Sequence, residues 1–583
     1  MRQTQTLISI SVIVLLISSS MFYIINFDNS INELQNNGNN SKFSETDCSS
    51  EVRYMGQPIH VDSFNGNDSN PGTEACPLLT INAAVNNSTS GDTVIVHSGI
   101  YHEEIIYSDL SDLTIKAADG ERVVIDGTVS ISSDLNKIWS SPQNGIQQVE
   151  LGIDAWQLFL NFREEVPARW PNANFDDGSV FNRSHNWAHG TMTPNGNEYS
   201  NGEIIDSGGV DGGHSGLNDS GIDPVGAIAI LNVGSFKTWS RLVTTYDSET
   251  SKFTYSPVSG WKEKHHAYFL EGKLELIDVE GEWFFNSSSK ILFYMPPEGN
   301  NANNLDLRVK VQAYSFDFSN SNNITLQGLE FFGTTFRFFD CTNCSVTDST
   351  LLYPSTSKRG LGIAAENSDE RWTTRMDRCK NCLIDSSAFL YTDGAAIEMH
   401  GAELQNHNNT INNTYFYHID WSVSDLPGLM TTIYIGGRDN NFENSTVHLT
   451  GASATLSIGD APTVMYSRIN NTGLLQTDGA VVQMMMLEQQ SSNIAYNWIY
   501  ETEKYGIRMD GPSSFSDNNG RNASVHHNVL WDIKGGIMMK GDYHSATNNT
   551  IFGLRIQDYN HLIVLHENGW GNENSTIASN AAD

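Results

Sequence analysis

The chain repeats a short pattern that is first clear as TDGAAIEMHG at residues 392–401. Each copy is a short apolar stretch that alternates in polarity and ends at glycine or at a polar residue. Alternation with a period of two is typical of a strand with one buried face, so a series of similar strands is predicted. The later copies are TTIYIGG at 431–437, TDGAVVQM at 477–484, KYGIRMDG at 504–511 and KGGIMMKGD at 534–542.

A second repeated pattern, which begins with asparagine, stands between these copies. Its apolar positions recur after 22 residues from Ile324 to Val346 and after 31 residues from Ile494 to Val525. Repeats of about 20–40 residues with short strands and no helical period are typical of solenoids. We therefore predict an all-β fold, a right-handed parallel β-helix whose coils lie about 4.8 Å apart and are stable only against their neighbours. The second pattern begins at Asn323, Asn343, Asn381, Asn409, Asn493, Asn522 and Asn548.

Composition limits the classes of partner. The chain has 583 residues with 33 basic and 68 acidic side chains, a formal charge of −35. Charged residues make up only 17% of the chain, which fits a turn-rich all-β protein. A surface this acidic repels nucleic acid, anionic membranes and polyanionic sugars at long range, and it also favours solubility. We expect no nucleic-acid partner, and we expect a monomer.

The N-terminus has the pattern of a targeting segment. Residues 1–27 carry Arg2 before an apolar run, which fits a signal peptide or a signal anchor that holds the protein to a membrane. Residues 28–50 are polar and rich in asparagine and serine, as in a flexible tether. We therefore expect an extracellular or cell-surface protein. Sequons such as the one at Asn182 permit N-glycosylation of an exported chain.

Six cysteines fit an exported protein. Two CxxC pairs fall at the same place in successive repeats, which favours stacked disulfides between coils over a zinc site. A third disulfide would tie the tether to the first coil. The expected disulfides are Cys341–Cys379, Cys344–Cys382 and Cys48–Cys76.

The rest of the chain divides into three parts. Residues 51–157 contain an N-terminal cap and the first coils, residues 158–297 break the repeat as an inserted β domain, and residues 298–583 form the main β-helix. A polar loop near the start holds Asp62, Asn65 and Asp68, whose oxygens suit calcium or hydrogen bonds within the loop. We expect no required cofactor and no metal site.

Four motifs mark the limits of the insertion. LFLN at 158–161 and ARWPN at 168–172 open it, and GEWFFN at 281–286 and LFYMPP at 292–297 close it. This set resembles β-helical, pectate-lyase-like carbohydrate-active proteins, and its layout is similar to glycoside hydrolase families with fucosidase, xylanase and β-xylosidase members. The resemblance covers the chain from about residue 59 onward and implies a polysaccharide or glycan as substrate. These motifs are not catalytic, so the resemblance transfers no catalytic residue.

The repeated strands described above predict where a catalytic or binding site lies. Aligning them on their apolar centres places one set of residues on an outward face that is polar and varied. It offers carboxylates and hydrogen-bond donors for sugar hydroxyls, although a solvated face with ion pairs between coils is the alternative. The outward residues are Ala364, Glu398, Tyr434, Ser457, Gln483, Arg508 and Met538 in one column and Glu366, His400, Gly436, Gly459, Met485, Asp510 and Lys540 in another, with Asp460 at the rim.

The spacing between coils indicates which pairs of carboxylates would suit a hydrolase. Retaining glycosidases hold their carboxyl groups about 5 Å apart and inverting ones about 6.5–9.5 Å apart. Asp460 and Asp510 lie two coils apart in this alignment, so we predict them as an inverting pair, with Glu398 as a competing acid. Asp393 and Asp478 lie in equivalent turns, and we prefer Asp478 as a participant because it lies between Asp460 and Asp510.

Substrate contacts and two other function classes remain open. His400, Tyr434, Gln483 and Lys540 offer polar contacts to a sugar, and Trp372 offers a stacking surface. One alternative is a polysaccharide lyase that uses Arg508 or Lys540 as the base. The other is a non-catalytic glycan-binding surface protein.

Overall fold

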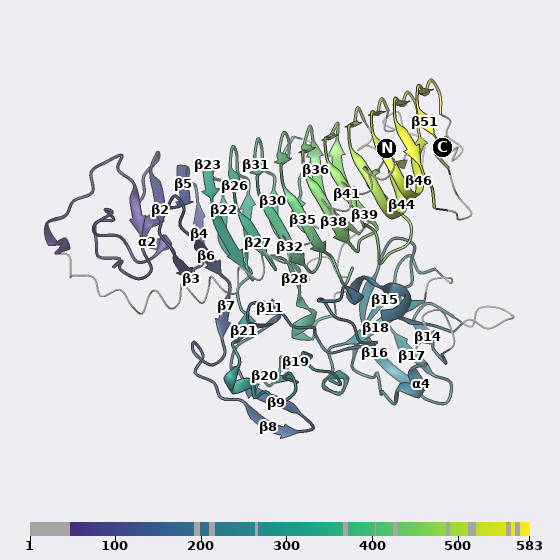
Figure 1. The fold of residues 1–583 in the computed structure, drawn as a ribbon, viewed down its shortest axis with the longest axis horizontal. Helices are drawn as coiled ribbons and strands as arrows, with labels where there is room; N and C mark the ends of the chain where they lie inside the picture. The colour runs from purple at the N-terminus through teal and green to yellow at the C-terminus, as the bar shows by residue number, and fades with distance from the viewer. Residues whose placement is uncertain are drawn as a thin grey trace, which may run out of the picture.

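The protein is a right-handed parallel β-helix with a large β insertion along one side (Figure 1). The computed structural model describes residues 47–191, 199–208, 216–262, 266–364, 371–402, 404–423, 430–485, 490–510, 521–555, 561–565 and 572–582. The targeting segment at 1–27 and most of the tether lie outside these residues, as does Glu366 of the outward column. Among the described residues, no helix is long and apolar enough to cross a membrane.

Each full coil contributes one strand to each of three faces. The first face is a sheet of parallel strands, β1 (Ile59–Val61), β2 (Thr93–Val96), β5 (Ser111–Ala117), β23 (Asn322–Gln327), β26 (Ser345–Thr347), β31 (Leu383–Asp385), β34 (Thr410–Asn412), β37 (Asn441–Glu443), β40 (Thr463–Met465), β43 (Asn493–Ala495), β45 (Ser524–His526), β47 (Ser545–Thr547) and β50 (Thr576–Ala578).

The second and third faces are joined at the C-terminal end by long strands that bend from one face to the other. The second face contains β3 (Gly99–Tyr101), β6 (Val123–Asp126), β24 (Leu329–Phe332), β27 (Thr350–Leu352), β32 (Ala388–Thr392), β35 (Tyr415–Ile419), β38 (Thr446–Thr450), β41 (Arg468–Asn470), β48 (Thr550–Phe552) and β51 (Ala581–Ala582). The third contains β4 (Ile105–Ser108), β22 (Tyr314–Ser319), β25 (Thr335–Phe339), β30 (Arg375–Asp377), β33 (Ile397–Met399), β36 (Thr431–Arg438), β39 (Ala454–Asp460), β42 (Ala480–Met484) and β49 (Ile563–Leu565). The strands β44 (Trp498–Asp510) and β46 (Val529–Lys540) belong to both.

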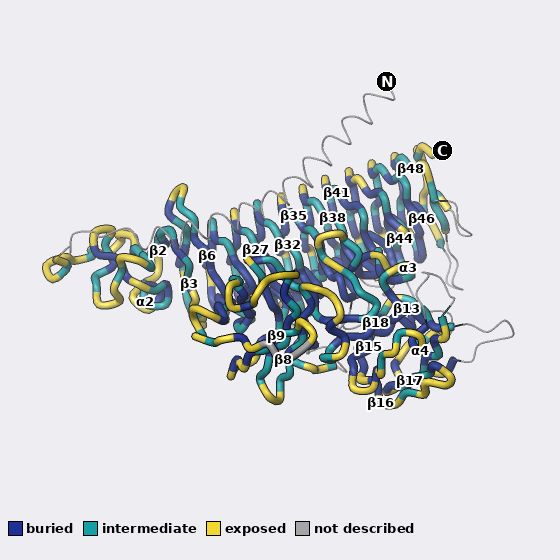
Figure 2. The backbone as a smooth tube through the Cα atoms, turned by 60° about the horizontal axis from the view of Figure 1, so that its bottom comes forward, coloured by how far each residue is buried: buried dark blue, intermediate teal, exposed yellow. Residues whose placement is uncertain are grey.

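The apolar centres of the repeat form one continuous interior column, which confirms the predicted register. Ile397 pairs with Ile433, and the column continues through every later coil. These side chains are fully buried, and the buried interior runs along the helix in Figure 2. Burying such a side chain stabilises the fold by about 1.5–3 kcal/mol, and each coil provides the apolar surface that its neighbours need. The later members are Leu456, Val482, Ile507 and Ile537.

A ladder of polar side chains lines the corner between the first and second faces. Asn497, Asn528 and Asn549 are fully buried there, and each Oδ1 accepts a hydrogen bond from the backbone N–H of the preceding ladder residue. The Nδ2 of Asn497 donates to the Oδ1 of Asn528 at 3.0 Å, and Asn528 donates to Asn549 at 3.0 Å. The ladder therefore satisfies backbone groups that the turn removes from the sheet.

The insertion is wider than the expected 158–297. β6 pairs with β24, and β4 pairs with β22, so the helix is interrupted from residue 127 to residue 313. The difference arises because β7 (Thr128–Ser130) and β21 (Leu307–Lys310) pair with each other and leave the helix together. The insertion thus grows from the corner between the second and third faces of the second full coil, which β5, β6 and β22 form.

Three antiparallel sheets and two short helices build the insertion. One sheet contains β7, β21, β10 (Leu158–Leu160) and β11 (Arg163–Glu164), and another contains β8 (Ser140–Gln143), β9 (Ile146–Glu150), β20 (Ile291–Tyr294) and β19 (Trp283–Asn286). The largest contains β12 (Arg169–Trp170), β13 (Ala188–His189), β18 (Ala267–Glu271), β15 (Ile228–Asn232), β16 (Trp239–Asp247), β17 (Lys252–Tyr255) and β14 (Glu203–Ile205). The helices are α3 (Arg183–Asn186) and α4 (Leu217–Ser220).

The N-terminal end is closed as expected. Helix α2 (Ile81–Asn86) buries Ile81, Ala84 and Val85 against the first strands. The predicted Cys48–Cys76 disulfide is confirmed, with Cα atoms 5.8 Å apart. In the polar loop, Asp62 accepts hydrogen bonds from backbone N–H groups of the loop itself.

The two predicted disulfides between coils, Cys341–Cys379 and Cys344–Cys382, are wrong, because all four cysteines are free and buried. The pairs do stack, since their flanking residues pair in register. In-register parallel strands hold Cβ atoms about 4.8 Å apart, which is more than the roughly 3.5–4.5 Å of a disulfide. Cys344 and Cys382 instead belong to a second ladder, at the corner between the third and first faces. Cys344 N donates to Cys382 Sγ at 3.4 Å, and Cys382 N donates to Asn409 Oδ1 at 3.0 Å.

The ladder predicts a large cost for Asn528→Ala. The change leaves the buried backbone N–H of Asn497 without its partner and removes one of the two hydrogen bonds of the Asn497 amide, so the free energy of unfolding should fall by about 2–4 kcal/mol. Urea denaturation followed by circular dichroism measures this. The control is Asn300→Ala in an exposed loop, which should change stability by less than about 0.5 kcal/mol. Equal losses in both variants would contradict the ladder's role.

The free thiols predict a simple alkylation pattern. Iodoacetamide should leave the native chain unmodified, because the four thiols are buried and the other two cysteines are bonded. Unfolding without reductant should add four labels, and unfolding with reductant should add six, as read by intact mass. Fewer than four labels without reductant would show that a second disulfide exists.

Candidate functional site

The predicted outward column lies on the third face from Glu398 onward. Its predicted first member, Ala364, is wrong, because that residue lies outside the strands and Arg375 of β30 pairs with Glu398 instead. Glu398 pairs with Tyr434, and Gln483 pairs with Arg508, as the sequence alignment required. The column does not converge on one point, because four coil steps separate Glu398 from Arg508, a distance of roughly 19 Å. The structure therefore divides the predicted site residues into separate clusters.

One cluster surrounds Glu398, which is only 4% exposed. Its carboxylate accepts a hydrogen bond from Thr373 Oγ1 at 2.9 Å and lies 3.8 Å from His400 Nε2. The His400 ring packs at 4.9 Å from the Tyr434 ring. Asp460 lies further along the face, with Arg438 Nη1 at 3.5 Å from its carboxylate.

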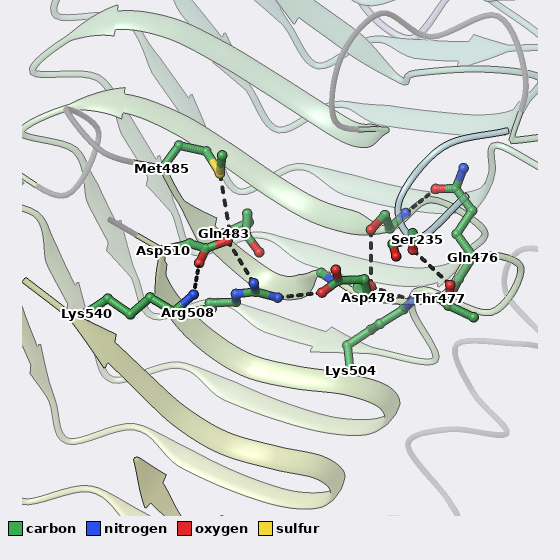
Figure 3. A network of polar contacts seen from close by, with 12 residues as sticks. Ser235, Gln476, Thr477, Asp478, Gln483, Met485, Lys504, Arg508, Asp510 and Lys540 are labelled. Atoms are coloured by element: carbon green, nitrogen blue, oxygen red, sulfur yellow. Dashed lines mark hydrogen bonds and ion pairs between the residues drawn. The ribbon is translucent and has the colours of Figure 1, made fainter. Parts of the chain in front are cut away.

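A second cluster is a chain of ion pairs near the C-terminal end (Figure 3). Arg508 donates to Asp478 at 2.6 Å and lies 2.8 Å from Asp510, which also accepts from Lys540 Nζ at 2.6 Å. Gln483 Nε2 lies 3.4 Å from Asp510. This cluster brings together five of the predicted site residues.

Charge compensation dominates this second cluster. Burial opposes ionisation of Asp478, but the Arg508 guanidinium outweighs burial and holds the pKa of that carboxyl below its ordinary value. Asp478 is thus a carboxylate at neutral pH rather than a proton donor. Asp510 is enclosed by two cations, and the predicted inverting partner Asp460 has its own arginine.

Trp372 lies at the insertion rather than on an open face. Its ring stacks on that of Trp156 with centroids 4.5 Å apart, and Lys358 Nζ lies 4.9 Å from the Trp372 ring. The Trp372 ring therefore already has two protein neighbours.

A different set of polar residues lines the corner from which the insertion grows. Thr392 pairs with Ile419, which aligns the next residues, Asp393 and Asp420, in neighbouring coils. Continuing this register defines the corner column, one residue per coil beneath the insertion. Its members are Asp393, Asp420, Gly451, Gly473, Glu503 and Lys534.

At Asp393 the corner column and the insertion enclose a polar cavity. Arg359 lies 2.5 Å from Glu271 and 3.2 Å from Asp393, and Ser422 donates to Asp393 at 2.5 Å. The open space measures about 30 Å³, which is room for water. Its wall also contains Trp156, Gln157, Glu164, Trp283 and Trp421.

Glu164 lies in this cavity with a pKa well above its ordinary range. Burial raises the pKa of Glu164 to about 8, with a hydrogen bond from Gln157 opposing the shift and the Asp393 charge adding to it. Glu164 therefore keeps its proton at neutral pH, while Asp393 lies against an arginine. Two carboxyl groups whose surroundings favour opposite protonation states are the pattern of an acid and its partner carboxylate. Nearby, burial lowers the pKa of Lys310 to about 7.

Three polar atoms in the cavity wall have no protein hydrogen-bond partner within the described part of the chain. They are Gln157 Oε1, Trp156 Nε1 and Trp421 Nε1. Gln157 and Trp421 are 3% and 2% exposed, so the wall offers one acceptor and two donors to whatever enters the cavity.

Sequence reasoning ranked Asp393 low and missed Glu164, Glu271 and Arg359. A signal for the corner column was present, since Tyr391-Thr392-Asp393 and His418-Ile419-Asp420 fall at the same place in successive coils. No comparable signal points to Glu164, because only the fold brings the insertion to Asp393.

Comparisons with known proteins give distant similarities to solved structures alone. No protein-family model matches the sequence, and no curated protein matches it. One similar solved structure, described as a glycoside hydrolase, has a TM-score of 0.45 and 13% identity over 90% of this chain and 95% of that chain. XylC in complex with xylose has a TM-score of 0.36 and 14% identity, covering 85% of this chain and 69% of XylC.

A third similar structure is an adhesin. PfbA, a surface adhesin of Streptococcus pneumoniae, has a TM-score of 0.29 and 13% identity, covering 46% of this chain and 74% of that one. All three TM-scores lie below 0.5, so these likenesses do not distinguish one activity from another.

The raised pKa of Glu164 predicts a pH-dependent stability. An unfolded glutamate titrates near 4.5, so the folded chain keeps a proton up to about pH 8 that the unfolded chain has lost. The stability that this neutral carboxyl provides is fully present below about pH 4.5 and is lost as pH rises through about 8. Glu164→Gln removes this titration, so its free energy of unfolding should fall less between pH 5 and 8.5 than that of the wild type.

Urea denaturation at the two pH values measures the difference. Glu165 and Glu282 have pKa values of about 7 and contribute to both proteins, so they cancel in the comparison. Parallel falls in the wild type and the variant would show that Glu164 is already ionised at neutral pH.

Proposed function

We propose that the protein acts on a carbohydrate and hydrolyses a glycosidic bond at the cavity between the insertion and the helix. The carrying observation is that Glu164, which keeps its proton at neutral pH, and Asp393, which lies against Arg359, share one tryptophan-lined cavity. Glycosidases need this pair of roles, an acid for the leaving oxygen and a carboxylate at the sugar carbon.

Each residue has a definite role in the proposal. Glu164 donates its proton to the glycosidic oxygen as the bond breaks, and Asp393 acts at the anomeric carbon directly or through a water molecule. Arg359 lies 3.2 Å from Asp393, and its positive charge favours the carboxylate form. Asp420 lies one coil step from Asp393, about 4.8 Å, which is close to the carboxyl spacing of retaining enzymes.

Substrate binding has to widen the cavity, since a sugar ring exceeds about 30 Å³. The surrounding aromatic rings suit the apolar faces of a sugar, and the indole N–H groups and the Gln157 amide suit its hydroxyls. We further propose that the protein acts outside the cytosol. The Cys48–Cys76 disulfide supports this, because disulfides persist in oxidising compartments.

The test combines product masses with two substitutions. The chain is incubated with neutral and acidic polysaccharides, and fragments that have gained one water are expected. Glu164→Gln and Asp393→Asn should each lower turnover by about 10²-fold or more, because each removes one half of the acid–carboxylate pair. In the wild type, turnover should fall as pH rises through about 8, where Glu164 loses its proton.

Matched variants separate this site from the others. Glu165→Gln, at the neighbouring carboxyl hydrogen-bonded to Tyr294, should retain activity. Loss of turnover in Asp478→Asn or Asp510→Asn, but not in Asp393→Asn, would move the site to the ion-pair cluster of the third face. Unsaturated fragments without added water would establish a lyase, and intact polymers throughout would favour a binding protein.

A further inference from the structure

Further along the corner column lies a larger cleft of about 410 Å³. The insertion contributes one wall through residues 181–184, and the helix contributes the other. The volume falls within the range of ligand-binding clefts. The helix wall contains Gly473, Leu474, Gln476, Thr477, Asp478, Glu503, Lys504 and Lys534.

The cleft collects positive charge in an acidic protein. Arg183, Lys504 and Lys534 all line it, although the chain has only 33 basic residues against 68 acidic ones. Arg183 donates to the backbone oxygen of Leu475 at 3.1 Å, and Lys504 donates to the backbone oxygen of Asp478 at 2.7 Å. These partners are neutral carbonyl groups rather than carboxylates.

The two carboxylates of the cleft are engaged by other arginines. Asp478 binds Arg508 at 2.6 Å, and Glu503 forms an ion pair with Arg555. Among the described residues, no carboxylate lies within ion-pair distance of Arg183, Lys504 or Lys534. The three basic side chains therefore line the cleft without a carboxylate in direct contact.

Holding these cations together costs free energy. Burial is the main reason that the pKa of Lys504 lies well below its ordinary value. Repulsion from Arg183 and Lys534 adds to this shift, and the charges of Asp478 and Glu503 oppose it. Burial also lowers the pKa of Arg183. An anion placed between the three groups would replace this repulsion by attraction.

We propose that this cleft binds a negatively charged group of a glycan, either a uronate carboxylate or a sulfate ester. The proposal rests on the proposed carbohydrate function and adds the substrate class. Gly473 lies three coil steps from Asp393 in the corner column, roughly 14 Å. A glycan that reaches both places is thus a chain whose charged residue lies some units away from the cleaved bond.

The test uses three probes that differ only at C6 of one sugar, namely glucose, glucuronate and glucose 6-sulfate. Binding to the full chain carrying Asp393→Asn is measured by calorimetry and by the shift in melting temperature. At least one of the anions should bind about tenfold more tightly than glucose, and the preference should weaken with salt. Binding of one anion only would identify which group the cleft takes.

Charge-removing variants locate the binding. Arg183→Gln combined with Lys534→Gln should weaken anion binding about tenfold or more. Lys116→Gln removes a charge far from the cleft, beside Asp119, and should leave binding unchanged. Equal binding of all three probes, or anion binding that survives the double variant, would overturn the proposal.

This result is independent of the hydrolysis test, because no turnover is needed. Loss of anion preference with intact hydrolysis would defeat the inference alone. Retained anion binding without hydrolysis of any polymer would defeat the proposed reaction alone.

Discussion

The rest of the structure depends on parallel, in-register stacking of coils. Because each coil lies about 4.8 Å above the last, a residue meets its own equivalent in the next coil. Apolar positions thereby merge into one interior column, and buried turn positions form a ladder from Asn497 to Asn549. The same constraint keeps Cys344 and Cys382 as stacked thiols, since it fixes their Cβ atoms too far apart for a bond.

Stacking also explains why an insertion can make one edge of the molecule different from the others. A solenoid has a uniform surface along its length unless something breaks its symmetry. Here the break is the pairing of β7 with β21, which carries the chain out of the corner between the second and third faces. The insertion then runs along that corner, so a residue that would face water, such as Asp393, lines an enclosed cavity instead.

The periodic features of the fold, such as which residues share a column, could be predicted from the sequence. The pairing of Glu398 with Tyr434 and of Gln483 with Arg508 was predictable, because a repeat fixes which residues share a column. The Glu164–Asp393 neighbourhood was not predictable, since 229 residues separate the two and no repeat relates the insertion to the helix. The predicted limits of the insertion were wrong for the same reason, because β7 lies about 180 residues before its partner β21.

Ion pairing on the third face and charge burial at the corner have different physical meanings. The Asp478–Arg508–Asp510–Lys540 chain is largely buried, but each carboxylate has a cation in direct contact, so the charges compensate one another and need no ligand. At the corner, Glu164 is held neutral, Lys310 titrates far below its usual range, and Lys504 lies among like charges.

Each of these corner groups costs free energy that an apolar interface between insertion and helix would avoid. Nothing in the fold requires that cost, because Trp421 and Leu475 show that the same corner accepts apolar packing against Phe181. Groups with strongly shifted pKa values that line a cavity are the usual signature of a functional site. The distribution of unfavourable burial therefore favours the corner beneath the insertion, rather than the more conspicuous ion pairs of the third face, as the place where this protein meets its substrate.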